Sequence, residues 1–142
     1  MILDTTYILP LAKIGIDTDL LTLIDEGKIR ISMDDVRVSM ISLFELQARV
    51  AKYKLPPKLA VDAVNIINSS LKIEPFYNPE VIEVADKLSR ELSDYVDCLI
   101  LATAIALKED LVTEDSEINK KKAMIEGIYK IRVLRYRDVI KQ

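Results

Sequence analysis

The chain has 142 residues, of which half are apolar and 30% are charged, and its formal net charge is −3. This length and balance predict a single globular domain, residues 1–142, with a full core. The lack of histidine and the single cysteine exclude Ser-His-Asp and Cys-His catalytic centres, and zinc sites built from histidines or several cysteines. Carboxylates remain as ligands, and they favour Mg²⁺ or Mn²⁺.

The sequence gives no sign of a membrane segment or of export. Its longest apolar run, Cys98–Leu107, is too short to span a bilayer, and the N-terminus lacks the basic segment and cleavage site of a signal peptide. A single cysteine cannot form an internal disulfide and fits a reducing compartment. We therefore expect a cytoplasmic protein without a membrane partner.

Hydrophobic periodicity predicts alternating strands and helices in the first half of the chain. A short apolar strand ends at Asp4, and Ser42 with Glu45 has the spacing of a capping box at a helix start. The expected elements are a strand at 1–3, helices at 7–14 and 17–26, an extended piece at 30–32, a strand at 36–40, and helices from 42 to about 54 and at 58–71.

The second half of the chain continues the alternation around one apolar helix. Residues 93–108 are apolar nearly all round after Asp97, which indicates a central, buried helix. The other expected elements are a strand at 72–76, a helix from Pro79 to about 92, a strand at 111–113, a helix at 116–126 closed by Gly127, a strand at 131–134 and a short helical tail. Such alternation predicts an α/β fold, a three-layer α/β/α sandwich around a mainly parallel sheet.

Four acids stand where the predicted strands end or the next helices begin: Asp4, Glu45, Asp97 and Asp115. Ligands of open α/β sheets bind at the carboxyl ends of the strands, so these carboxylates are candidates for one pocket. Two carboxylates about 4 Å apart repel by about 4 kcal/mol at an effective dielectric near 20, and a divalent cation would compensate them.

Each of these acids also has a local structural explanation. Asp4 and Asp115 could cap the helices that follow them, and Glu45 could complete its capping box. Asp97 could favour the dipole of its own helix. Capping and metal binding are compatible, so the residues alone leave both explanations open.

Four segments resemble, in order, the motifs of the PIN-domain family, which includes the VapC toxins of prokaryotic toxin–antitoxin pairs. They are Ile2–Thr6, Ser39–Leu46, Asp97–Ala104 and Leu111–Asp115. The resemblance extends over nearly the whole chain. It departs from the family at Cys98 and Leu101, which replace smaller residues, and at Lys28–Asp35, which look like extra material.

The resemblance implies a Mg²⁺- or Mn²⁺-dependent endoribonuclease that hydrolyses RNA phosphodiester bonds. Asp4, Glu45 and Asp97 would hold the first metal ion, and Asp115 would act through water or help a second ion. Thr6 and Thr113 would orient ligands or waters through their hydroxyls. The resemblance also implies a homodimer and the role of a toxin with an antitoxin partner.

Other charged residues are assigned less specific roles. We expect Asp94 and Glu117 to be solvated or to support the ligands rather than to bind metal. The candidates for binding the RNA backbone are Arg49, Lys52 and Lys120–Lys122. Residues 118–142 carry eight Lys and Arg against two acids, which fits either a phosphate-binding surface or a solvated helix face.

Two alternative functions remain open. The chain could be a PIN-like module with weak or lost cleavage that acts by binding a protein partner, with the apolar helices at 17–26 and 58–71 as its interface. It could also be a phosphotransfer domain with Asp4 as aspartyl nucleophile. Such phosphatases carry an Asp-x-Asp arrangement. It is absent here, because Thr6 stands at the second Asp position, and its absence disfavours the last alternative.

Overall fold

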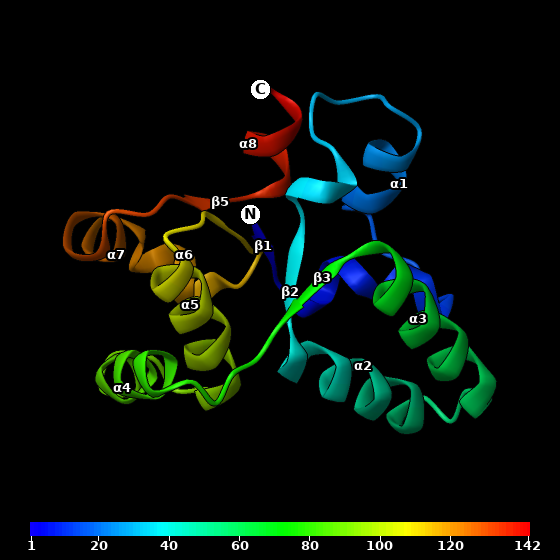
Figure 1. Cartoon of the computed structure of the whole chain (residues 1–142), viewed down its shortest axis with the longest axis horizontal. Coiled ribbons are helices and arrows are strands. Elements are labelled where there is room, and N and C mark those ends of the chain that lie inside the picture. The colour runs from blue at the N-terminus through cyan, green and yellow to red at the C-terminus, as the bar shows by residue number, and fades with distance from the viewer.

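Five short parallel strands run through the middle of the computed structural model, which describes residues 1–142 (Figure 1). The strands are β1 (Ile2–Leu3), β2 (Arg37–Ser39), β3 (Lys72–Glu74), β4 (Leu111–Val112) and β5 (Val133–Leu134). Their order is β3-β2-β1-β4-β5, and every neighbouring pair is parallel. The chain builds the sheet outward from β1 on one side and then returns to β1's other side, which creates a switch point between β1 and β4.

Helices connect all the strands. The 3-10 helices are η1 (Thr5–Ala12) and η2 (Met33–Asp35). The α-helices are α1 (Leu20–Asp25), α2 (Met40–Lys52), α3 (Pro57–Ser70), α4 (Pro79–Leu88), α5 (Tyr95–Leu107), α6 (Ser116–Lys120), α7 (Lys122–Tyr129) and α8 (Tyr136–Ile140). None of them is both long and apolar enough to cross a bilayer.

Alternation of side chains along the strands produces two core clusters, one on each face of the sheet. Leu3 and Val112 contribute to a cluster with the buried side chains of η1 and α1–α3. Their neighbours Ile2 and Leu111 point the other way, into a cluster with α4–α7. Figure 1 shows these two helix groups on opposite sides of the strands. The predicted three-layer sandwich and its parallel sheet are therefore confirmed.

The predicted capping box at the start of the second-motif helix is wrong. Helix α2 begins at Met40, and its N-cap is Ser39, whose hydroxyl accepts a hydrogen bond from the Ile41 N–H at 3.3 Å. Ser42 is buried inside the first turn, and Glu45 turns toward η1 instead of back to its own helix start. The explanation of Glu45 as a purely local cap therefore fails.

A capping box does occur where the sequence predicts an extended piece at 30–32. The hydroxyl of Ser32 accepts from the Asp34 N–H at 3.2 Å, and the Asp35 carboxylate accepts from the Ser32 N–H at 3.2 Å. This reciprocal pair starts η2, so residues 30–32 form no strand.

The predicted helix at 116–126 is two helices, α6 and α7. A tight turn separates them, in which the Lys121 N–H donates to the Ile118 carbonyl at 3.1 Å. Gly127 lies inside α7 rather than after it, and the helix ends at Lys130, which adopts the left-handed conformation with φ of 60°. The prediction that Gly127 ends the helix is wrong, because its backbone here is helical.

Candidate metal centre

A polar hollow of about 310 Å³ opens at the carboxyl ends of β1 and β4. Its walls come from the residue after β1, from η1, α2 and the start of α5, and from the loop after β4. The residues that line it are Asp4, Thr5, Thr6, Leu9, Glu45, Arg49, Asp94, Asp97, Glu114 and Asp115. All four acids singled out in the sequence are among them, and Arg49 is the one basic residue.

Asp4 stands directly after β1 and is almost fully buried, with 9% of its surface exposed. It is the N-cap of η1, and one carboxylate oxygen accepts from the Thr5 N–H at 2.7 Å. The other oxygen accepts from the Thr113 hydroxyl at 2.6 Å. The predicted capping role of Asp4 is confirmed, and its side chain still borders the hollow.

Thr113 joins the two central strands at the hollow. Its hydroxyl donates to Asp4 and accepts from the Asp115 N–H at 3.0 Å. Asp115 in turn caps α6 by accepting from the Ile118 N–H at 2.8 Å. Thr113 is thus in a position to hold both acids, which is what its predicted role of orienting ligands requires.

Thr5, which sequence analysis did not single out, holds Glu45. The Thr5 hydroxyl donates to a carboxylate oxygen of Glu45, and it lies 2.9 Å from the Ser42 hydroxyl. These contacts tie η1 to α2 across forty residues of sequence. Thr6 also lines the hollow, and its predicted role stays a prediction. Only the run of two threonines after Asp4 could have signalled Thr5.

Asp97 enters the hollow from the first turn of α5. The N-cap of that helix is Asp94, whose carboxylate accepts from the N–H groups of Val96 and Asp97 at 2.8 and 3.4 Å. Asp94 therefore supports the helix that carries Asp97 while adding a further negative charge to the hollow.

Crowding of carboxylates in this hollow opposes their ionisation. Burial, followed by the charges of Asp4, Asp115, Asp94 and Glu45, raises the pKa of Asp97 to about 8. Burial also raises the pKa of Asp4, although hydrogen bonds from Thr113 and Thr5 counteract it. The pKa of Glu45 is raised mainly by burial, against the hydrogen bond from Thr5. A bound cation would relieve this repulsion.

The donor set fits a hard divalent ion. Carboxylate oxygens from several elements face one polar hollow, and oxygen is the donor that Mg²⁺ and Mn²⁺ prefer. As the side chains stand, no three acids are close enough together to hold an ion. Mg²⁺ often binds only one or two carboxylates directly and keeps waters for its other positions, so it does not require three acids in direct contact.

Thr5→Val is expected to weaken Mn²⁺ binding about tenfold, because it removes the hydrogen bond that orients Glu45 while keeping the side-chain volume. Calorimetric titration would measure the dissociation constant. Thr103→Val is the matched control, since it removes another buried threonine hydroxyl that bonds to the Leu99 carbonyl at 2.8 Å, outside the hollow. Equal losses in both variants would show that Thr5 has no special part in the site.

The chain belongs to the PIN domain family, because the model of that family matches residues 1–123. This confirms the family resemblance deduced from the four motifs. No curated protein sequence gives a significant match.

Solved structures of similar fold come from toxin–antitoxin complexes. A chain in the structure of VapBC2 from Rickettsia felis, bound to a DNA fragment from their promoter, is 22% identical, with a TM-score of 0.65 and coverage of 94% of this chain and 96% of that one. A chain of FitAcB from Neisseria gonorrhoeae is 21% identical, with a TM-score of 0.63 and coverage of 96% and 97%. A chain of a toxin–antitoxin complex from Klebsiella pneumoniae is 21% identical, with a TM-score of 0.58 and coverage of 82% and 88%. At these identities, the likeness establishes the fold.

Proposed function

We propose that this chain is a metal-dependent endoribonuclease that cuts RNA, and that it is the toxin of a toxin–antitoxin pair. One observation carries the nuclease proposal: in a PIN domain, four acids from separate elements line a single polar hollow, and burial and mutual repulsion raise the pKa of three of them, Asp4, Glu45 and Asp97. The RNA substrate follows from the family resemblance.

In this proposal, Asp4, Glu45 and Asp97 hold Mg²⁺ or Mn²⁺, and Asp115 acts through a water or supports a second ion. When bound, the metal supplies a water of lowered pKa and polarises a phosphoryl oxygen. Thr113 holds Asp4 in place and Thr5 holds Glu45, which keeps the carboxylates preorganised. Arg49, at the edge of the hollow, offers a positive charge to the RNA backbone.

A gel assay on structured and unstructured RNA, with Mn²⁺, Mg²⁺ or EDTA, tests the nuclease proposal. We expect cleavage with either metal and none in EDTA. Equal cleavage in EDTA would contradict metal dependence. If no RNA is cut, calorimetric Mn²⁺ titration decides the matter: binding would point to a narrow substrate, and its absence to a module that acts only through a protein partner.

RNA binding is expected to weaken steeply between about 50 and 200 mM salt, because cations that contact phosphates release counterions. Arg49→Gln with Lys52→Gln, on the exposed face of α2, should lower the slope of log affinity against log salt by about 0.7 for each lost contact. Filter binding in EDTA would measure it. Lys72→Gln, at the start of β3 and therefore at the opposite end of the sheet, is the control. A slope near zero for the parent would rule out the basic surface.

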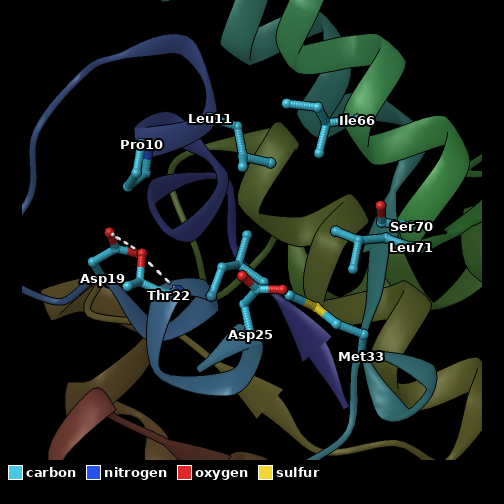
Figure 2. A pocket seen from close by; sticks show the side chains of 10 residues that line it. Pro10, Leu11, Asp19, Thr22, Asp25, Met33, Ile66, Ser70 and Leu71 are labelled. Carbon is cyan, nitrogen blue, oxygen red and sulfur yellow. Dashed lines mark hydrogen bonds between the residues drawn. The ribbon is translucent and has the colours of Figure 1, made fainter. Parts of the chain in front are cut away.

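An antitoxin partner is proposed from the fold neighbours and from a second hollow of about 270 Å³, shown in Figure 2. It lies between η1, α1, η2 and the end of α3, where the sequence had suggested an interface. Leu11, Leu21 and Ile66 give it apolar walls, and Asp19 and Asp25 lie on its border. These features suit an apolar segment that also carries Lys or Arg, so we assign the hollow to the antitoxin.

Ile66→Arg should break the proposed complex with an antitoxin, because it places a charge in the apolar wall of the hollow. Co-expression followed by size-exclusion chromatography would measure it. Val61→Arg is the control, since Val61 is exposed on the same helix and does not line this hollow. A complex that survives Ile66→Arg would place the partner on another surface.

Three further expectations remain proposals. Homodimerisation is supported by exposed apolar side chains at Met40 and Phe44 on α2 and at Ile82 on α4. Organisation of residues 1–142 as one domain is supported by the single sheet, which pairs strands from both ends of the chain. Cytoplasmic location is supported by the lone, buried thiol of Cys98.

A further inference from the structure

Two contacts fasten α6 to the loop between α4 and α5, outside the polar hollow. The N–H and the hydroxyl of Ser93 donate to the two carboxylate oxygens of Glu117, at 2.8 and 2.7 Å. The Lys121 ammonium, at the end of α6, lies 3.3 Å from a carboxylate oxygen of Glu91. Both oxygens of Glu117 are engaged by Ser93, and Glu117 does not line the hollow. Its carboxylate therefore links α6 to the loop before α5 and does not face a ligand in the hollow.

Glu117 and Ser93 are each next to a helix start that carries an acid of the hollow. Ser93 precedes Asp94, the N-cap of α5, and Asp97 follows in the first turn. Glu117 lies in the first turn of α6, two residues after its N-cap Asp115. The Ser93–Glu117 contact therefore joins the helix start that carries Asp97 to the helix start that carries Asp115.

The other side-chain hydrogen bonds around the hollow join other pairs of elements, and neither of them links α5 to α6. The Thr113–Asp4 bond joins β4 to β1, and the Thr5–Glu45 bond joins η1 to α2. Asp97 and Asp115 stand at two helix starts, those of α5 and α6. The two helix starts that carry them are held together by Ser93 and Glu117.

We propose that Glu117 is a positioning residue: through Ser93 it sets the spacing between Asp97 and Asp115, and thereby the metal affinity and turnover of the site. This inference rests on the proposed metal-dependent function. Contacts behind metal ligands change affinity or activity by about 10- to 100-fold when lost. We expect the lower end of that range here, because the contact is exposed to solvent.

The test compares Ser93→Ala, Glu117→Ala and the double variant with the parent. Ser93→Ala changes no charge, so weaker Mn²⁺ binding by this variant cannot arise from a reduced negative charge near the site. Glu80→Ala is the matched control, because Glu80 is an exposed acid in the first turn of α4. We expect the Mn²⁺ dissociation constant to rise about tenfold in Glu117→Ala and by less in Ser93→Ala. The double variant should be no worse than Glu117→Ala, since both changes break one contact.

Kinetics and amide exchange separate positioning from general damage. Glu117 itself is not among the proposed RNA contacts, so kcat should fall while KM stays the same. The N–H groups of Val96, Asp97 and Ile118 should exchange faster in Glu117→Ala, while the melting temperature without metal stays near that of the parent.

The outcomes distinguish this inference from the proposed function. If the parent binds Mn²⁺ and cuts RNA, and both variants match it, the positioning role of Glu117 is overturned and the nuclease stands. The positioning role is also overturned if Mn²⁺ binding weakens in Glu117→Ala but not in Ser93→Ala, and if the difference disappears at high salt. The effect would then be one of charge alone. A parent that neither binds Mn²⁺ nor cuts RNA would overturn both.

Discussion

Asp97→Asn is expected to abolish RNA cleavage and, at the same time, to stabilise the metal-free protein at pH 8. The carboxylate is proposed to hold the metal, and metal ions supply several kcal/mol of transition-state stabilisation. A loss of about 4 kcal/mol corresponds to a rate lower by roughly 10³-fold. The gain in stability arises because asparagine removes a charge that burial and the acids around it disfavour.

The stabilisation should depend on pH in a defined way. In the parent, the pKa of Asp97 is raised from 3.8 to about 8, so the folded state opposes its ionisation above pH 4. At pH 8 and above, Asp97→Asn should gain about 1–2 kcal/mol, since solvent screens a half-exposed carboxyl. Below about pH 4 the gain should vanish, because the parent carboxyl is then protonated in both states.

Single-turnover cleavage with saturating Mn²⁺, and urea unfolding in EDTA at pH 4, 6 and 8, would measure the two effects. Asp86→Asn, an exposed acid on α4, is the control and should change neither. An Asp97→Asn variant that cuts RNA at the parent rate would refute the assignment of Asp97 as a ligand. A variant that is less stable than the parent at pH 8 would show that the carboxylate is needed for folding.

The placement of the four acids could be deduced from their positions along the chain and one topological rule. Asp4 and Asp115 each follow a short apolar run with a hydroxyl residue nearby, and Asp97 opens the most apolar helix. Parallel strands bring such positions to one edge of the sheet, and the order of the strands here does so for β1 and β4. The N-caps suggested at Asp4 and Asp115 were correct for the same reason, because a cap depends on a few adjacent residues.

Glu45 was assigned to the hollow by the same strand-end rule and by family resemblance, while its capping-box pattern misled. The sequence Ser42-Leu-Phe-Glu45 satisfies the capping-box spacing, yet the N-cap is Ser39, three residues earlier. The decisive contact is with Thr5, forty residues away, and no local pattern contains it. The choice between Thr5 and Thr6 likewise depends on how the tight turns of η1 direct two adjacent side chains.

The contacts around α6 show the same limit. The turn at Lys121 that ends α6 is not encoded by glycine or proline, and Lys121 pairs with Glu91 on a distant loop. Glu117 was expected to be solvated or to support the ligands, but nothing local pointed to Ser93 as its partner, 24 residues earlier. Side-chain pairs between loops need the fold before they can be recognised, whereas caps and buried strands do not.

The stability of the metal-free protein is expected to fall as pH rises from about 4 to about 8, and divalent metal should reverse this trend. Between those values the folded protein binds more protons than the unfolded chain, because the pKa of Asp97 is raised to about 8. Stability must therefore decrease with pH over that window. The pKa values of Asp4 and Glu45 are also raised, so these residues add to the decrease of stability with pH.

Metal binding acts in the opposite sense. An ion that binds only the folded state stabilises it by about 2.7 kcal/mol at a concentration 100 times its dissociation constant. Protons compete with the metal for the carboxylates, so the stabilisation should be greater at pH 8 than at pH 5. With Mg²⁺ present, the curve of stability against pH should thus flatten or rise, where the curve in EDTA falls.

Urea unfolding at pH 5, 6.5 and 8, with EDTA or with Mg²⁺, would measure both curves. Asp97→Asn serves as the internal control, because it should flatten the EDTA curve and reduce the gain from metal together. Stability in EDTA that rises from pH 5 to pH 8 would show that the acids of the hollow are not under mutual repulsion. A falling EDTA curve that Mg²⁺ leaves unchanged would keep the repulsion but remove the metal from the site, and with it the basis of the nuclease proposal.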